Sequence, residues 1–200
     1  GTVAALAPSD PAAPARITKR IAACLGPAVT RPLVPLLEAV HDRAAIEIQR
    51  GCSEGCRFCQ AGMIYRPVRE RPPAEVVDAV EELLRNTGYD EVGLLSLASS
   101  DYSEIEALLD ALTARFAPAH VSFSLPSLRV DAFSVRLAQR VQTTRKTGLT
   151  FAPEAGSERL RAVINKNVTE EDLLQTAEAA YSAGWDRIKL YFMIGLPTET

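Results

Sequence analysis

Three of the four cysteines in this 200-residue chain, Cys52, Cys56 and Cys59, fall within one short stretch. Their spacing, C-x3-C-x2-C, lets a single loop turn three thiolates toward one soft metal centre. A structural zinc site needs a fourth ligand to close its tetrahedron, and the chain offers Cys24 or His41. Three thiolates without a fourth suit a [4Fe–4S] cluster in which one iron stays open to a substrate or cosubstrate.

Cys24 and His41 each have a simpler interpretation than metal binding. Cys24 lies in the apolar stretch 21–25, which predicts a small buried side chain. His41 stands beside Asp42 and Arg43, which predicts a surface position. Two alternatives from other functional classes stay open: a zinc-binding interaction domain completed by one of these residues, and an iron–sulfur module for electron transfer without a cosubstrate.

Composition places the chain among ordinary globular proteins. Apolar residues make up 47% and charged residues 24%, which excludes a disordered chain, a fibrous repeat and a disulfide-dense mini-protein. The net charge of −3 argues against a protein that wraps nucleic acid. We find no apolar stretch long enough to cross a membrane and no secretory signal, so we expect a cytoplasmic location.

The elements that must position the cysteines are short apolar runs alternating with helical stretches. The runs cover 44–49, 92–97, 121–125, 149–152 and 188–194. Helical signals mark 73–86, 103–115, a short stretch after Asp131, 157–164 and 169–182. The second of these helices begins with Ser103 and Glu106, a capping-box pattern. This alternation predicts an α/β fold with parallel strands, either an open sheet or a barrel.

Three regions follow from these patterns. Residues 1–16 are rich in Ala and Pro and predict a flexible lead-in. Residues 17–43 carry several prolines and predict an extended segment packed on the core. Residues 44–200 form the core domain, with about five strand–helix units. Because the chain stops after an apolar run, where another helix is due, we expect the core to be incomplete at its C-terminus.

The cysteine loop, with Phe58 directly before Cys59, resembles the signature of the radical S-adenosylmethionine (radical SAM) enzymes. The resemblance covers residues 44–200, and 46–51 is similar to the family's first barrel strand. It implies a partial parallel (β/α) barrel and a [4Fe–4S] cluster bound by the three cysteines, with S-adenosylmethionine on the fourth iron. Reductive cleavage of S-adenosylmethionine then gives a 5′-deoxyadenosyl radical that removes hydrogen from a substrate.

The same resemblance implies the cosubstrate contacts, and each follows a predicted strand. Phe58, directly before the last cysteine of the loop, is one of them. Ser96 and Ser99 lie where the family contacts the methionine amino group, although its usual Gly-Gly-Glu is absent here. Glu154 resembles the carboxylate that meets the ribose hydroxyls; alternatively it is a favourable charge at the start of the helix near Ser157. The adenine is expected to lie along a Gly-Leu-Pro stretch, and here its members are Ile194, Gly195, Leu196 and Pro197.

A narrower resemblance, over 50–72 and 151–173, is to radical enzymes with a cobalamin-binding domain ahead of the barrel. We expect any cobalamin to be held by a domain outside this chain. The family implies an electron donor such as flavodoxin or ferredoxin. The substrate and the outcome (methylation, methylthiolation, rearrangement or oxidation) stay open. Five arginines near the cluster loop either bind carboxylates, phosphates or RNA, or pair with Glu54, Glu70 and Glu75; they are Arg50, Arg57, Arg66, Arg69 and Arg71.

Overall fold

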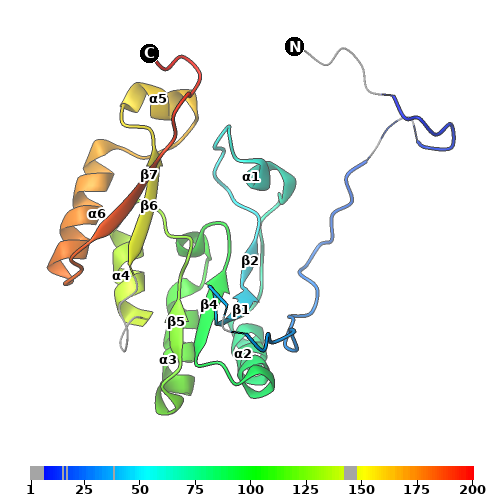
Figure 1. Ribbon diagram of the computed structural model, residues 1–200, viewed down its shortest axis with the longest axis vertical. Helices are drawn as coiled ribbons and strands as arrows, with labels where there is room; N and C mark the ends of the chain where they lie inside the picture. The colour runs from blue at the N-terminus through cyan, green and yellow to red at the C-terminus, as the bar shows by residue number, and fades with distance from the viewer. Residues whose placement is uncertain (1–6, 15, 17, 38, 142–147) are drawn as a thin grey trace.

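Figure 1 shows the computed structural model, which describes residues 7–14, 16, 18–37, 39–141 and 148–200. Two groups of strands stand side by side, each with helices packed on it. The predicted α/β fold with parallel strands is confirmed. Along the chain the elements are β1 (Ala44–Glu47), β2 (Gln49–Arg50), α1 (Gln60–Ile64), β3 (Arg69–Glu70), α2 (Pro73–Thr87), β4 (Glu91–Leu95), η1 (Ser99–Asp101), α3 (Ile105–Phe116), η2 (Ala117–Ala119), β5 (Ser122–Ser124), α4 (Ala132–Val141), β6 (Leu149–Glu154), α5 (Glu158–Val163), α6 (Glu170–Ser182) and β7 (Ile188–Phe192).

The first group is a parallel sheet with strand order β1-β4-β5. Ala44 and Ile46 of β1, and Ile48 just after it, are alternate residues whose side chains are buried in the core. The apolar faces of α2 and α3 supply the other half of that core. Because side chains alternate across a strand, Glu47 and Gln49 lie on the opposite face of the sheet. Helices α2 and α3 therefore cover one face of the sheet and leave the opposite face uncovered.

The second group is the parallel pair β6-β7, packed with α4 and α6. Phe151 and Trp185 are buried at its centre. Among the described residues no strand pairing joins β5 to β6, and a pocket of about 190 Å³ lies between residues 124–126 and 148–150. Pro126 closely follows the three-residue β5 and has no N–H for a longer ladder. The barrel is therefore open at this seam.

A small antiparallel pair, β2-β3, is an element that the sequence did not predict. The expected run 44–49 is divided into β1 and β2, and the cysteine loop and α1 follow β2. Gly51 makes the turn with a φ of +94°, and a Cβ there would lie 2.7 Å from the carbonyl oxygen of Tyr65. Only glycine fits this close approach. The loop that carries the cysteines is thus anchored at both of its ends.

The predicted helices are present, but one of the predicted starts is wrong. Ser103 does not cap α3, whose N-cap is Glu104. The backbone N–H of Ser103 instead donates to the carboxylate of Glu70 at 2.9 Å, and its hydroxyl binds the same carboxylate. The Ser103 hydroxyl, which would cap the helix in a capping box, is instead hydrogen-bonded to Glu70. The starts of the helices at 157–164 and 169–182 are as expected, with Ser157 and Thr169 as N-caps.

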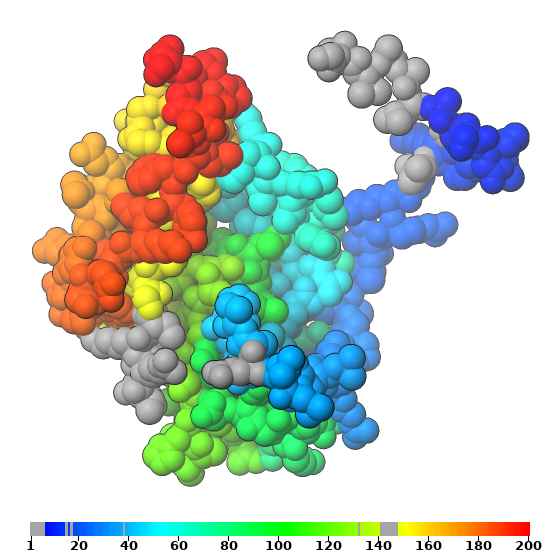
Figure 2. All heavy atoms as spheres, in the orientation of Figure 1, coloured from blue at the N-terminus to red at the C-terminus, as the bar shows by residue number. Residues whose placement is uncertain are grey.

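The described residues of 7–43 contain no helix or strand, and the first of them reach away from the body of the molecule (Figure 2). Further along, this segment lies against the outside of the core. The guanidinium of Arg71 donates to the carbonyl of Gly26 at 2.9 Å, and the Asn86 amide donates to that of Thr30 at 2.9 Å. The prediction that Cys24 is buried is wrong: its side chain is exposed, because the segment that carries it lies on the outside of the core. No helix among the described residues is long and apolar enough to span a membrane.

Candidate functional site

The three clustered cysteines line one pocket of about 250 Å³. All three are half-buried free thiols. Cys59 is also the N-cap of α1, and its Sγ accepts a hydrogen bond from the backbone N–H of Gly62 at 3.3 Å. We call this the cysteine pocket; its remaining lining residues are Glu54, Phe58, Leu97, Ala98, Ser127, Leu128, Arg129, Val130, Ala152, Glu154, Lys166, Asn167 and Val168.

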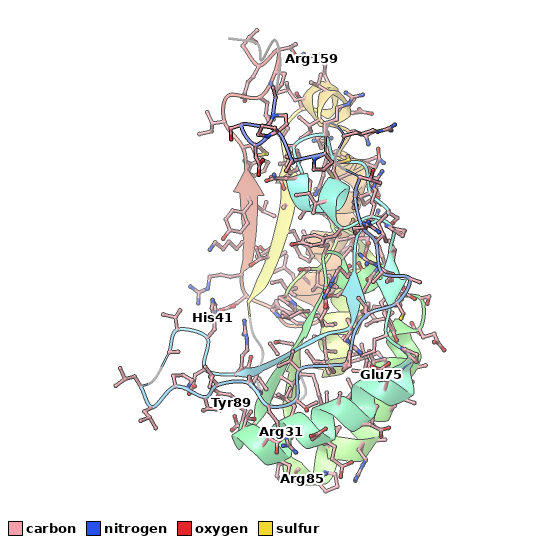
Figure 3. The ribbon with its side chains drawn as sticks, turned by 90° about the vertical axis from the view of Figure 1, so that its right-hand side faces the viewer. Arg31, His41, Glu75, Arg85, Tyr89 and Arg159 are labelled. Atoms are coloured by element: carbon pink, nitrogen blue, oxygen red, sulfur yellow. The ribbon has the colours of Figure 1, made fainter. Side chains whose placement is uncertain are left out.

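The geometry of the pocket bears on which metal centre these thiols fit. Among the residues that the structure describes, no three His, Cys, Asp or Glu side chains converge closely enough for a single metal ion. Cys24 and His41 are exposed and lie outside this pocket. His41 stands on the segment that enters β1, far from Arg159 of α5 (Figure 3). A [4Fe–4S] cluster fits better, because each thiolate binds a different iron and no single point of convergence is needed.

The protonation of the thiols follows from their surroundings. Burial raises the pKa of Cys52 and of Cys56. A hydrogen bond from the Glu54 backbone partly offsets the rise in pKa at Cys52, and the charge of Lys166 partly offsets it at Cys56, while the negative charge of Glu54 adds to the rise at both. Both groups are therefore neutral thiols at pH 7 in the protein alone, and binding iron must release their protons.

The cysteine loop is held in place by the turn at 163–166, more than a hundred residues away. The side-chain amide of Asn165 donates to the carbonyl of Gly55 at 2.9 Å, and the N–H of Arg57 donates to that of Ile164 at 2.9 Å. The Arg57 guanidinium also binds the carbonyl of Val163. A Cβ on Gly55 would lie 2.7 Å from the Asn165 amide, so a larger residue at position 55 would displace the Asn165 side chain. Asn165 joins the cysteine loop to the fourth strand–helix unit.

A second tie runs through Arg129, at the end of the loop after β5. Its guanidinium lies 2.6 Å from Glu54, 3.3 Å from Asp101 and 3.8 Å from Asp131. Burial raises the pKa of Asp101, and the adjacent Arg129 partly offsets this rise. One cation is thus shared by three carboxylates, and its contact with Glu54 fixes the loop that lies between Cys52 and Cys56.

Glu154 reaches the cysteine pocket from the end of β6. It has a φ of +68°, and the ladder to β7 is irregular between Phe151 and Glu154. Burial raises the pKa of its carboxyl, and Lys166, with its Nζ 4.0 Å from Oε1, partly offsets that rise. A non-glycine residue held at positive φ is strained, and such strain gathers at functional sites. The acid in the first turn of α5 is Glu158, so Glu154 is not the charge that stabilises that helix.

The segment 194–197 is not among the residues that line the cysteine pocket. Ile194 is 96% exposed, and Leu196 is buried against Ala155 and Leu160. The N–H groups of Gly195 and Leu196 donate to the carboxylate of Glu199 at 2.6 and 2.8 Å. Pro197 is exposed. The segment nevertheless starts beside the site, because the N–H of Met193 donates to the carbonyl of Glu154 at 2.8 Å.

Ser96 and Ser99, the two serines predicted to contact the cosubstrate, are hydrogen-bonded to each other with their hydroxyl oxygens 2.8 Å apart. Ser99 is fully buried, and its N–H donates to the carbonyl of Ser127 at 2.8 Å. Ser96 lines a neighbouring pocket rather than the cysteine pocket. Of the predicted cosubstrate contacts, Phe58 and Glu154 share the pocket of the three cysteines.

The arginines near the loop have mostly backbone partners. Arg57, Arg66 and Arg69 donate to carbonyl oxygens. Of the three carboxylates expected to pair with these arginines, only Glu75 does so among the described residues, with Arg71. The carboxylate of Glu54 forms its ion pair with Arg129 instead.

The family model of the Radical SAM superfamily matches residues 46–200, the range that holds the cysteine loop and Glu154. The chain belongs to the radical SAM superfamily. This family uses a [4Fe–4S] cluster and S-adenosylmethionine, as the three-cysteine loop led us to expect.

Individual relatives are consistent with this membership. An uncharacterized protein of Methanocaldococcus jannaschii is 39% identical over 155 residues, which is 78% of this chain and 33% of the relative. A tRNA-2-methylthio-N(6)-dimethylallyladenosine synthase of Desulforamulus reducens is 27% identical, over 84% of this chain and 38% of its own. The chain spans about a third of the length of these relatives.

Among solved structures, the radical S-adenosylmethionine methyltransferase TsrM of Kitasatospora setae, with cobalamin and a [4Fe–4S] cluster bound, has a similar fold. Its TM-score is 0.64 at 16% identity, and the match covers 79% of this chain and 32% of TsrM. At this identity the likeness concerns the fold.

Sequence reasoning missed three residues of the site: Arg129, Asn165 and Lys166. Asn165 and Arg129 act on the cysteine loop from distant parts of the chain, and Lys166 acts on Glu154 from the turn after α5. The segment 151–173 carried the family resemblance and includes two of them, but nothing in its spacing marks them as partners of the loop. Only their contacts in the folded chain do so.

Proposed function

We propose that this chain is the catalytic core of a radical SAM enzyme, with Cys52, Cys56 and Cys59 as ligands of a [4Fe–4S] cluster. The observation that carries the proposal is that these thiols, from one loop, share a pocket with Glu154, from the end of a distant strand. When bound, the cluster supplies the electron that cleaves S-adenosylmethionine to a radical able to remove hydrogen from a substrate. The three cysteines would hold the cluster, and the cosubstrate would lie in the cysteine pocket between them and Glu154.

The residues of the chain bind the cosubstrate and orient the cysteine loop. The carboxylate of Glu154 accepts hydrogen bonds from the two ribose hydroxyls, and Lys166 favours its charged form. Arg129 and Asn165 keep the cysteine loop in one conformation. Phe58, Ser96 and Ser99 stay predicted cosubstrate contacts. The same is true of the adenine segment at 194–197, which would have to turn its exposed backbone toward the ligand.

For the reaction outcome we propose transfer of a methyl or methylthio group. Supporting this are the named activities of a sequence relative, which modifies an adenosine of tRNA, and of a protein of similar fold, which is a methyltransferase. A base in RNA is the substrate class that the first of these favours. Cobalamin, if the complete protein uses it, would be bound outside this chain. The electron donor would be a flavodoxin or ferredoxin in the cytoplasm.

The test is the EPR spectrum of the reduced, anaerobically reconstituted protein with and without S-adenosylmethionine. A change of the signal on addition shows an open iron that binds the cosubstrate. Cys56→Ala should abolish the iron content, and Cys24→Ala, which alters an exposed thiol, should leave it unchanged. An unchanged spectrum would favour a closed electron-transfer cluster, and zinc in place of iron would favour an interaction domain; either result contradicts the proposal.

A further inference from the structure

Lys166 lies beside Cys56, although the two residues are far apart in the chain. The two residues before Lys166 hold the cysteine loop on both sides of that cysteine. The amide of Asn165 donates to the carbonyl of Gly55 at 2.9 Å, and the N–H of Arg57 donates to the carbonyl of residue 164 at 2.9 Å. The Lys166 side chain is 22% exposed and lines the cysteine pocket together with Cys56. The fold therefore places a partly buried ammonium group next to a proposed ligand of the cluster.

The charge of Lys166 is less neutralised than that of the other cation in the cysteine pocket. That cation, Arg129, is shared by three carboxylates, the nearest of them 2.6 Å away. Among the described residues Lys166 has one ion pair, with Glu154, and its Nζ is 4.0 Å from Oε1, which is too long for a hydrogen bond. Its charge also acts on Cys56, where it offsets part of the rise in pKa. Lys166 thus adds a positive potential at the thiols.

The sign of that potential matters because reduction of an iron–sulfur cluster adds one negative charge to it. A nearby cation stabilises the reduced form more than the oxidised form, and a nearby anion does the reverse. Salt screens such an interaction less in a partly buried site than at an exposed surface. Lys166 should therefore make a cluster in this pocket easier to reduce, and Glu154 should make it harder to reduce.

We propose that Lys166 raises the reduction potential of the cluster held by the three cysteines, and that Glu154 lowers it. The pair then sets how strongly the site favours one-electron reduction by the electron donor, which is itself oxidised by that one electron. This inference rests on the proposed function for the presence of the cluster. The place and the sign of the effect rest on the contacts of Lys166 and Glu154 in the cysteine pocket.

The test is a redox titration of the anaerobically reconstituted protein, followed by EPR at pH 8 without S-adenosylmethionine. Lys166→Met should lower the ratio of reduced to oxidised cluster at a given potential about three- to tenfold. A tenfold change in this ratio is about 59 mV for a one-electron couple. Lys166→Arg keeps the charge and should titrate like the wild type. Glu154→Gln removes a negative charge and should raise the ratio by a similar factor.

Lys189→Met is the matched control. Lys189 belongs to β7, where its Nζ lies 4.9 Å from the centroid of the Tyr191 ring, and it does not line the cysteine pocket. Its replacement should leave the titration unchanged. A wild-type ratio in either Lys166→Met or Glu154→Gln would overturn the inference. Shifts of these two variants in the same direction would also overturn it, as would a Lys166→Arg protein shifted as far as Lys166→Met, because either result indicates a structural effect.

The iron content and the response to S-adenosylmethionine separate this inference from the proposed function. Each variant should hold as much iron as the wild type, because no cysteine is changed. If S-adenosylmethionine alters the EPR signal but all the proteins share one reduction potential, this inference is overturned and the proposed function stands. A chain that binds no iron–sulfur cluster would overturn both.

Discussion

At the scale of single residues, the position of Glu154 distinguishes between its two predicted roles, which are ligand binding and helix stabilisation. Its carboxylate lies in the cysteine pocket, whereas Glu158 supplies the charge in the first turn of α5. Glu154→Gln should keep the fold and the cluster and weaken S-adenosylmethionine binding about tenfold or more, because a charge-assisted acceptor is lost. Calorimetric titration of the reconstituted protein measures this. Glu158→Gln is the matched control: it should lower the melting temperature slightly and leave the affinity unchanged. Equal affinities for wild type and Glu154→Gln would remove Glu154 from the site.

Substitutions of Asn165 test whether its hydrogen bond holds the cysteine loop in place. It binds the carbonyl of Gly55 and itself has a φ of +54°. Asn165→Gly removes the hydrogen bond but tolerates the backbone, while Asn165→Ala removes the bond and adds strain. Both variants should lose cluster iron in air about two- to tenfold faster than the wild type, with alanine the worse. Absorbance decay and iron content measure this. Asn86→Ala removes an equivalent bond on α2 and should have no effect; identical decay in all four proteins would contradict the role of Asn165.

At the scale of elements, Tyr102 links the end of η1 to the residue that follows β3, Arg71. It is 2% exposed, and its hydroxyl donates to the carbonyl of Arg71 at 2.6 Å. Burial, with help from Glu104 and Glu70, raises the pKa of Tyr102 to about 12. The folded state therefore keeps this proton at a pH where the unfolded chain, with a tyrosine pKa of about 10, has lost it. The contribution to stability is fully present below pH 10 and is lost as the pH rises through 12.

We expect Tyr102→Phe to lower the free energy of unfolding by about 1 kcal/mol at pH 8 and to reduce the loss of stability between pH 10 and pH 12. Urea unfolding at pH 8 and at pH 11.5 measures both effects. Tyr181→Phe, at an exposed tyrosine of α6, should change neither. A Tyr102→Phe variant with the alkaline sensitivity of the wild type would show that other groups govern it.

At the scale of the whole molecule, two cores stand side by side without a strand ladder between them among the described residues. The outer strand of the second group, β7, presents Leu190, Tyr191 and Phe192 as exposed apolar side chains. A long apolar edge is a template for association. We expect this chain by itself to self-associate as its concentration rises, as sedimentation velocity would measure. Phe192→Lys should suppress association, and Leu174→Lys, at an isolated exposed leucine of α6, should not. Equal association of both variants would place the contact elsewhere.

Local signals account for the parts of the fold that were predicted correctly. The helix expected at 73–86 is α2, because Pro73 starts it and Gly88, in a left-handed conformation, ends it. The cap at Thr169 was equally local, since its partner Asp172 lies three residues away. Ser103 showed the limit of such signals: its pattern was that of a cap, but a carboxylate from β3 was closer in space.

The sequence by itself determined that three soft ligands lie on one loop, and therefore that this protein suits an iron–sulfur centre. Ligand type and spacing along a short loop depend on covalent geometry alone. The tertiary structure decided what surrounds that loop: Asn165 on Gly55, Arg129 on Glu54, and Lys166 on Glu154. The contacts of Asn165 and Arg129 with the loop depend on how distant segments pack, because residues 110 and 75 positions apart carry no local mark of the distance between them.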